Sequence, residues 1–165
     1  MDYNLIANLN NLLANIDNNG DVITTRGLRD IIKGEALGLR SFIYFDLLRM
    51  FGPIYKDNAS SPSIPYRTTF DRNTAKLLPA SEVIDKIIED LKAAEDLLEN
   101  DPMTITFPTG GVPTGFLSNR FNRMNKYAVK AELARAYLWK GDKTNAAIKA
   151  QEVIDNKQFA LVTDN

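Results

Sequence analysis

The chain has 165 residues, of which 44% are hydrophobic and 25% are charged, and its formal net charge at pH 7 is -1. These values are ordinary for a globular domain, and the near-neutral charge argues against a general nucleic-acid binder. The sequence contains neither cysteine nor histidine. It therefore excludes a thiol nucleophile, a disulfide, a Cys/His zinc site and a histidine general base.

Targeting and membrane signals are also absent from the residues of this chain. No stretch approaches the roughly 18 consecutive apolar residues of a transmembrane helix. The first residues, MDYNLIANLNNLLANI, lack the basic region and the small-residue cleavage site of a signal peptide. We therefore expect one helical domain over residues 1–165 and no leader within them.

Periodic apolar residues predict five helices, of which two precede the first long loop. In the first helix, residues 2–16, one face carries Leu5, Leu9, Leu12 and Ile16. The second helix, residues 28–51, carries aliphatic and aromatic side chains around much of its girth. A helix that is apolar on most sides is usually surrounded by other elements, so we expect this one to be central. The Gly52-Pro53 pair ends it.

Two long irregular segments, residues 52–79 and 101–122, hold all seven prolines of the chain. Loops of this length in a compact domain are usually functional or disordered. Between them, an amphipathic helix over residues 81–99 begins with Ser81 as the expected N-cap. Its apolar stripe is Ile84, Ile87, Leu91, Ala94 and Leu98.

The last two helices form a hairpin over residues 123–154, hinged at Gly141-Asp142. Their expected facing stripes are rich in alanine, namely Tyr127, Ala128, Ala131, Ala134 and Leu138 in one helix and Ala146, Ala147, Ala150, Val153 and Ile154 in the other. Leu133, Ala134, Tyr137, Gly141 and Ala146 follow tetratricopeptide spacing. Such a hairpin needs stacked neighbours to bury its apolar face. The fold class we predict is all-α, with tetratricopeptide-like helical repeats and two long irregular loops.

Charge is segregated between two of these helical regions. Residues 81–101 contain eight carboxylates and two lysines, whereas residues 120–149 contain eight basic side chains and two acids. A basic block of this kind can contact phosphate groups. An acidic helix lying beside a basic one explains the same pattern more simply, and we expect that arrangement.

Four ordered blocks resemble the SusD/RagB-like family. Residues 34–53, GEALGLRSFIYFDLLRMFGP, are similar to its signature helix, and IPYR at residues 64–67 follows in the same order. VIDKIIEDL at residues 83–91 and RMNKYAVKAELARAYL at residues 123–138 complete the match. Gly38 departs from the family pattern, which favours a better helix former. We attribute Gly38 to close helix packing, because glycine within a helix costs about 1 kcal/mol relative to alanine.

The resemblance implies a function that the residues alone do not. Members of this family are lipid-anchored outer-membrane proteins of Gram-negative bacteria. They bind oligosaccharides, or in some members peptides, and cover a SusC/RagA-type TonB-dependent transporter. Their tetratricopeptide-like helices form a scaffold, and the ligand surface lies mostly on loops. Members are about three times longer than this chain, so the resemblance implies a scaffold part whose lipid anchor lies outside it.

The sequence offers no catalytic residue, no metal ligand set and no cofactor motif. The Glu89-Asp90 and Glu95-Asp96 pairs are expected on the solvated outer face of their helix rather than in an acid/base site. The glycines at 110, 111 and 115 lack the G-K-[ST] ending of a phosphate loop. Residues 17–21, DNNGD, are only a weak echo of a calcium loop and predict a surface turn.

Loop aromatics with polar neighbours are the candidates for ligand binding, because aromatic faces stack on sugar C-H surfaces. The candidates are Tyr66, Arg67, Phe70, Phe116 and Asn119. Tyr55 and Phe107 belong to the same two groups of loop aromatics, and packing against other parts of the protein explains any of these positions at least as well. By contrast, we expect Trp139, Tyr44 and Phe45 in packed positions, and Arg40 and Arg49 paired with acids elsewhere in the fold.

The predicted function is therefore non-catalytic capture of nutrient oligosaccharides for a SusC-like transporter. The first alternative is a tetratricopeptide-type module for a protein or peptide partner, which a groove lined by Asn, Lys and Arg would favour. The second is an enzyme, which a pocket with several buried, strongly pKa-shifted carboxylates would favour.

Overall fold

The computed structural model describes residues 2–19, 22–25, 27–102 and 115–156 of the chain. Its helices are α1 (Asp2–Asn18), α2 (Leu28–Phe51), α3 (Tyr55–Asn58), α4 (Ala80–Leu97), α5 (Lys126–Lys140) and α6 (Lys143–Asp155), with the 3-10 turns η2 (Gly115–Leu117) and η3 (Arg120–Asn122). The described residues form no strand, only an isolated antiparallel bridge between Pro62 and Pro79. The predicted all-α class is therefore confirmed. The short α3 was not predicted.

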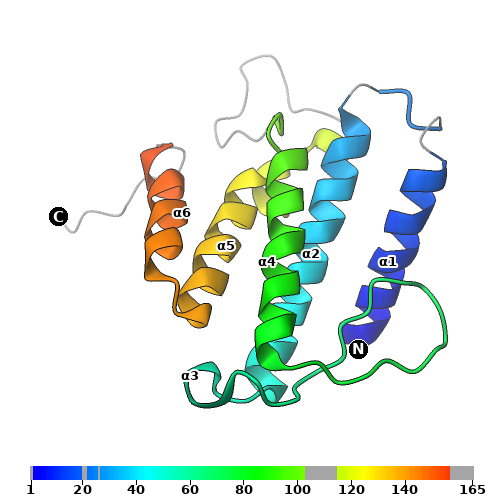
Figure 1. Cartoon of the computed structure of the whole chain (residues 1–165). Coiled ribbons are helices and arrows are strands. Elements are labelled where there is room, and N and C mark those ends of the chain that lie inside the picture. The colour runs from blue at the N-terminus through cyan, green and yellow to red at the C-terminus, as the bar shows by residue number, and fades with distance from the viewer. Residues whose placement is uncertain (1, 20–21, 26, 103–114, 157–165) are drawn as a thin grey trace.

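The long helices lie side by side, and α2 lies between α4 and α1 (Figure 1). Helix α2 packs against α1, α4 and α5, and Tyr44, Phe45 and Leu48 are almost completely buried. Two glycines permit this close packing. A Cβ on Gly38 would lie 2.7 Å from Met124 Cγ, and one on Gly34 would lie 2.8 Å from Leu98 Cγ. The expectation that Gly38 serves close packing is confirmed.

Helix α1 packs through a face that matches the predicted one only in part, since Ile16 is buried and Leu9 packs against the core. Its buried residues are Ile6, Asn10, Leu13 and Ile16, whereas Leu5 and Leu12 are 48% and 39% exposed. The periodicity of apolar residues favoured the face that carries Leu5, but the face that is buried includes a polar residue, Asn10. That side chain has hydrogen-bond partners across the core, which a count of apolar residues cannot anticipate.

Helix α4 begins one residue earlier than predicted. Its N-cap is Pro79, which makes no side-chain cap bond, so Ser81 is not the cap. The main-chain N–H of Ser81 instead donates to the Ala59 carbonyl over 2.8 Å, and that of Ala80 donates to the Ser61 carbonyl over 3.1 Å. These bonds to the preceding loop satisfy N–H groups that a cap would otherwise bind. The predicted stripe from Ile84 to Leu98 is buried.

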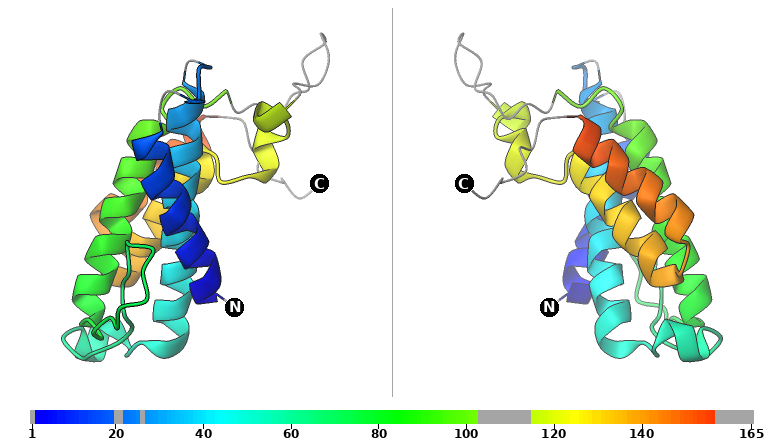
Figure 2. Two further views of the ribbon diagram at one scale, coloured as in Figure 1. Left: turned by 90° about the vertical axis from the view of Figure 1, so that its right-hand side faces the viewer. Right: turned by 90° about the vertical axis from the view of Figure 1, so that its left-hand side faces the viewer.

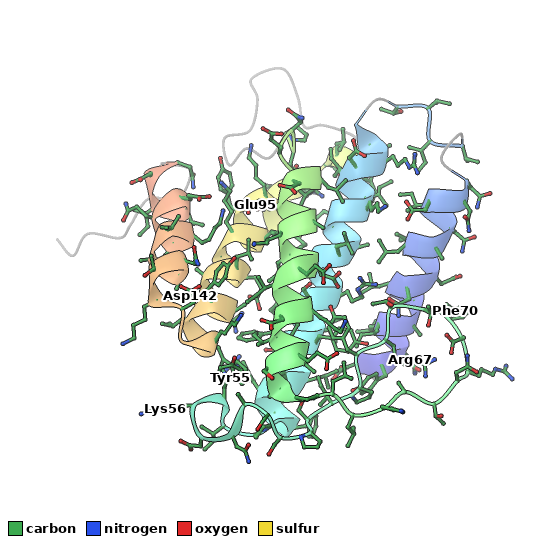
Figure 3. The ribbon with its side chains drawn as sticks, viewed as in Figure 1. Tyr55, Lys56, Arg67, Phe70, Glu95 and Asp142 are labelled. Atoms are coloured by element: carbon green, nitrogen blue, oxygen red, sulfur yellow. The ribbon has the colours of Figure 1, made fainter. Side chains whose placement is uncertain are left out.

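The acidic helix does lie beside the basic hairpin. Lys140 Nζ is 2.6 Å from Asp85 Oδ1, and Lys149 Nζ is 2.8 Å from Glu95 Oε1. Figure 3 shows Glu95 on α4 at the side that faces α5 and α6. Glu95 and Asp90 are partly covered and ion-paired, so their expected place on the outer face was wrong, whereas Glu89 and Asp96 are exposed as expected. Glu95 and Asp90 were misplaced because their cationic partners are distant in sequence.

The hairpin forms with the predicted hinge. Gly141 ends α5 with φ 91°, and the Asn125 side chain accepts hydrogen bonds from two N–H groups of the first turn. The most buried residues differ from the predicted facing stripes, apart from Ala146. Helix α5 buries Val129, Glu132, Leu133, Ala136 and Tyr137, Ala146 is the buried residue of α6, and Leu138 is 60% exposed. The tetratricopeptide-like assignment stays a prediction.

Trp139 is a packing residue, as expected. Its ring meets Phe45 edge-on with centroids 6.1 Å apart and lies 4.8 Å from the Tyr55 ring. Tyr55 is therefore partly occupied in holding α3 against α5 rather than displayed for a ligand. The pairing expected for Arg49 was wrong, because it bonds Asp46 one turn earlier on its own helix.

Candidate functional site

The segment of residues 59–79 is a closed loop rather than a loose connection. At its base the Ser63 N–H donates to the Leu78 carbonyl over 2.8 Å, and the Leu78 N–H donates to the Ile64 carbonyl over 3.1 Å. The Pro62–Pro79 bridge lies beside these bonds. The ends of the 59–79 segment are thereby fixed next to the start of α4, while its middle reaches across α2 to α1.

Three tyrosines stack across this end of the bundle. The Tyr44 and Tyr66 rings are nearly parallel with centroids 4.0 Å apart, and Tyr3 meets Tyr44 edge-on at 6.4 Å. Both are favourable geometries for aromatic pairs. Since each ring comes from a different element, the stack joins α1, α2 and the 59–79 segment.

The phenol groups add directional bonds to the stack. Tyr44 accepts the Arg67 N–H over 2.6 Å and donates to the Arg67 carbonyl over 3.0 Å. Tyr66 donates to Asp90 Oδ2 over 2.6 Å. Burial raises the pKa of Tyr44 to about 12, and burial followed by the charge of Asp90 raises the pKa of Tyr66. Both hydroxyls therefore remain protonated donors at neutral pH.

A buried polar chain runs behind the tyrosine stack. Arg40 binds Asp90 through Nε and Nη2, each over 2.8 Å, and donates from Nη1 to Asn10 Oδ1 over 2.8 Å. Asn10 Nδ2 in turn donates to the carbonyls of Arg67 and Thr69 over 3.0 and 3.3 Å. This chain satisfies groups that would be costly to bury alone. It also confirms that Arg40 pairs with an acid elsewhere in the fold.

The Arg67 side chain points away from that chain and organises the tip of the segment. Its Nη2 donates to the carboxylate and the carbonyl of Asp71 over 2.6 and 2.7 Å, and Nη1 donates to the Asn73 carbonyl. The Thr69 hydroxyl donates to the same carboxylate. That bond comes first among those that hold the pKa of Asp71 below its ordinary value, so Asp71 stays ionised. Figure 3 shows Arg67 and Phe70 beside the first turns of α1.

A pocket of ≈ 340 Å³ lies between this tip and α1, and we call it the α1 pocket. Its lining residues come from the two elements named above and are Tyr3, Ile6, Ala7, Pro65, Arg67, Thr69, Asp71 and Ala75. The volume lies near the lower end of the roughly 300–1,000 Å³ typical of ligand sites. The pocket joins an apolar wall to a charged edge.

The structure separates the predicted ligand residues into two groups. Tyr66 is half-buried in the tyrosine stack, Arg67 lines the α1 pocket, and Phe70 is 59% exposed on the same segment. Phe116 and Asn119 belong to η2 and its junction with η3, where α4 ends and α5 begins (Figure 2). The two groups lie at opposite ends of the bundle and cannot form one small site. Phe107 lies outside the described residues.

The second group rests on a buried ion cluster. Arg120 binds both carboxylate oxygens of Asp101 over 2.9 and 2.8 Å and Glu35 over 2.9 Å. Arg123 also binds Glu35, and its guanidinium lies 4.0 Å over the Phe116 ring. Burial lowers the pKa of Arg120, but the bonds to Asp101 and the charge of Glu35 outweigh it and raise that pKa. Phe116 thus has one face covered, and Asn119 is exposed with φ 54°.

Sequence reasoning missed Asn10 and Tyr3. A polar residue at a core position of an amphipathic helix was the available signal for Asn10. No sequence pattern marked Tyr3, because its contacts form only when the 59–79 segment folds back against α1. Within the described ranges, no group of three or more acids, histidines or cysteines is placed to hold a metal ion. None of the described helices has the length and apolar content needed to cross a membrane.

Known structures with this arrangement include proteins that are named as sugar-binding. A putative sugar-binding protein of Bacteroides vulgatus is 30% identical, with a TM-score of 0.70 over 93% of this chain and 31% of its own. A laminarin-binding SusD-like protein is 26% identical, with a TM-score of 0.69 over 92% of this chain and 28% of its own. The fold is therefore that of SusD-like proteins.

Sequence comparison agrees with the fold. SusD-like protein P2 of Formosa agariphila is 28% identical over 156 residues, which are 94% of this chain and 26% of that protein. Residues 1–138 match the SusD-like family described as starch-binding and associating with the outer membrane. The chain belongs to this SusD-like family, and the predicted resemblance is confirmed. It spans 26%, 31% and 28% of the lengths of these three relatives.

Proposed function

We propose that the protein captures nutrient oligosaccharides at the bacterial outer membrane without catalysis. The observation that carries this proposal is family membership over residues 1–138. The similarity to a laminarin-binding relative supports glycan as the ligand class. The α1 pocket and the exposed Phe70 add the combination of aromatic and charged groups that sugar recognition uses.

Binding without catalysis is consistent with the state of the carboxylates. Hydrolysis of a glycosidic bond uses two carboxyl groups facing one cleft, one of them protonated. In the α1 pocket Asp71 is paired with Arg67 and has a lowered pKa. Glu132 does have a raised pKa, caused first by burial, but it lies on α5 and lines none of the pockets described here.

Delivery to a SusC-like TonB-dependent transporter, and attachment to the membrane by a lipid anchor outside this chain, are the further parts of the proposal. They rest on the family, whose description includes association with the outer membrane. In this proposal the described helices act as a scaffold, and the ligand is held by the loops and later released to the transporter.

A peptide-binding groove has less support. A groove of ≈ 730 Å³ between α4 and the hairpin includes Lys130, Lys149 and Asn156, as a tetratricopeptide-type partner site would require. However, Lys130 binds Glu152 over 2.7 Å, and Lys149 binds both Glu95 and Glu152. With these lysines already paired, the groove presents little uncompensated positive charge to a peptide.

A combined glycan and peptide array tests the proposal. The whole protein is applied to neutral plant, algal and bacterial oligosaccharides and to a peptide library, and hits are measured by isothermal titration calorimetry. We expect saturable binding to a glycan, with no change in the glycan after long incubation as monitored by mass spectrometry. Binding to peptides alone, or cleavage of the glycan, would overturn the proposal.

A further inference from the structure

We propose that the α1 pocket is a subsite for one neutral sugar ring. The inference rests on the proposed glycan-binding function and specifies where one ring of the glycan is held and which charge class it has. Four features of the described residues support it, namely the size of the pocket, its apolar wall, its paired charges and the rigidity of its frame.

Size limits the occupant. A volume of ≈ 340 Å³ is at the lower end of the range for small-molecule pockets. It accommodates a single ring with its first hydration waters displaced, whereas an extended oligosaccharide must leave along the surface. The exposed Phe70 lies on the same segment, so it is available to a neighbouring ring outside the pocket.

The wall of the pocket is apolar on the α1 side. Ile6, Ala7 and the ring of Tyr3 come from the first two turns of the helix, and Pro65 adds a rigid ring from the loop. Tyr3 is 40% exposed and meets Tyr44 edge-on. A sugar presents C-H groups on its ring faces, and these pack against such a surface.

The opposite edge provides matched polar groups. An arginine has five N–H donors, and among the described residues three from Arg67 are used, toward Asp71 and Asn73. The Nε–H and one Nη1–H therefore remain for a ligand. The ionised Asp71 carboxylate accepts hydrogen bonds, so adjacent sugar hydroxyls can accept from Arg67 and donate to Asp71.

The same pairing selects against charge. The Arg67 guanidinium is 2.6 Å from Asp71 Oδ1, so the two charges largely cancel at the pocket edge. A uronic acid or a sulfated sugar would gain little from Arg67 and would be repelled by Asp71. A neutral sugar ring has no net charge to interact with, so the cancellation does not weaken its binding. We therefore expect the pocket to bind a neutral ring better than an acidic one.

The frame of the pocket is fixed before a ligand arrives. Asn10 holds the carbonyls of Arg67 and Thr69, and Tyr44 holds both main-chain polar groups of Arg67. These bonds orient Arg67 and Thr69 from behind while their side chains face outward. A ligand therefore incurs little ordering cost when it binds, which favours affinity.

The test compares pocket variants of the whole protein by calorimetry. The probe is the tightest binder among laminarihexaose, maltohexaose and xylohexaose, and hexameric alginate serves as the acidic probe. We expect Tyr3→Ala to weaken binding of the neutral probe at least tenfold. Asp71→Asn should weaken it at least fivefold and raise the affinity for alginate relative to the neutral probe, because Arg67 loses its counter-charge.

Controls separate the possible outcomes. Phe51→Ala removes an aromatic ring that is 69% exposed and does not line the pocket, and it should bind within twofold of the original protein. If Asp71→Asn does not fold, as judged by circular dichroism, the exposed Tyr3→Ala decides alone. Unchanged binding in the pocket variants would overturn the subsite and leave the proposed function standing. A protein that binds no glycan at all would overturn both.

Discussion

Replacing Asn10 by leucine should strongly destabilise the protein, although leucine is apolar and of similar size. Asn10 is 1% exposed, accepts from Arg40 and donates to the carbonyls of Arg67 and Thr69. Losing a hydrogen bond to a charged group costs about 1.5–3 kcal/mol, and each neutral bond about 1 kcal/mol. Since water can reach the partly buried carbonyls, we expect a net loss of about 2–4 kcal/mol.

Urea unfolding followed by circular dichroism measures this loss. With a slope of about 2 kcal/mol per molar, a loss of about 3 kcal/mol lowers the midpoint by about 1.5 M. The matched control is Asn15→Leu on the same helix, where the exposed side chain bonds only to Asn11 in the described structure. The control should lie within about 0.5 kcal/mol of the original protein.

Hydrogen exchange adds a local readout to the Asn10 experiment. In Asn10→Leu the amide of Arg67 should exchange faster than in Asn15→Leu at matched overall stability, because the loop loses its fixed carbonyls. Equal stability of the two variants would refute the reasoning that the buried polar chain holds the 59–79 segment against α1.

Four further substitutions test other parts of the scaffold. Gly34→Ala should cost about 1–3 kcal/mol, and more than Gly38→Ala, because its new Cβ meets a main-chain carbonyl at 3.2 Å whereas that of Gly38 meets only side chains, those of Met124 and Val129. Arg120→Met should cost about 3–5 kcal/mol, since it leaves the buried Asp101 carboxylate without its cationic partner and leaves Glu35 with Arg123 alone. Glu132→Gln should stabilise by about 1 kcal/mol at pH 7, because it removes a charge that burial disfavours while its amide oxygen can still accept from Arg135.

Urea midpoints check each of these values. The Glu132 effect also has a pH signature. Burial raises the pKa of Glu132, so the folded state binds the proton more tightly and stability rises as pH falls through that raised pKa. The advantage of the Gln variant should therefore be full at neutral pH and vanish below the ordinary pKa of glutamate. An advantage of the Gln variant that does not change with pH would contradict the argument for Glu132. An Arg120→Met variant as stable as the original protein would contradict the argument for the ion cluster. Equal costs for the two glycine variants would contradict the argument from their contacts.

Helix positions could be predicted from the sequence because they depend on local patterns. Apolar periodicity and the Gly52-Pro53 stop located α2 at residues 28–51, and the stripe from Ile84 to Leu98 located the buried face of α4. The all-round apolar character of α2 indicated its central place. The signature blocks identified the family, since they occur in a fixed order along the chain.

The buried face of each helix and the residues of the pocket were harder to predict, because both depend on residues that are distant in sequence. The stripes of α1 and α5 were misplaced where a polar residue, Asn10 or Glu132, occupies a core position. Arg67 was a reasonable candidate, but the other wall of the α1 pocket comes from Tyr3, which is far away in sequence. The pairing of Tyr66 with Asp90 likewise depends on how the 59–79 segment folds back, which no local pattern encodes.

The Arg120 cluster has a consequence for how this part of the protein can change over evolution. Arg120 and Asp101 are nineteen positions apart in sequence, and their bond ties together the two ends of the intervening segment. Doubling the length of a flexible loop costs only about 0.6 kcal/mol in closure entropy. The bond between Arg120 and Asp101 can therefore tolerate insertions and substitutions in the residues between them while the helical bundle stays intact.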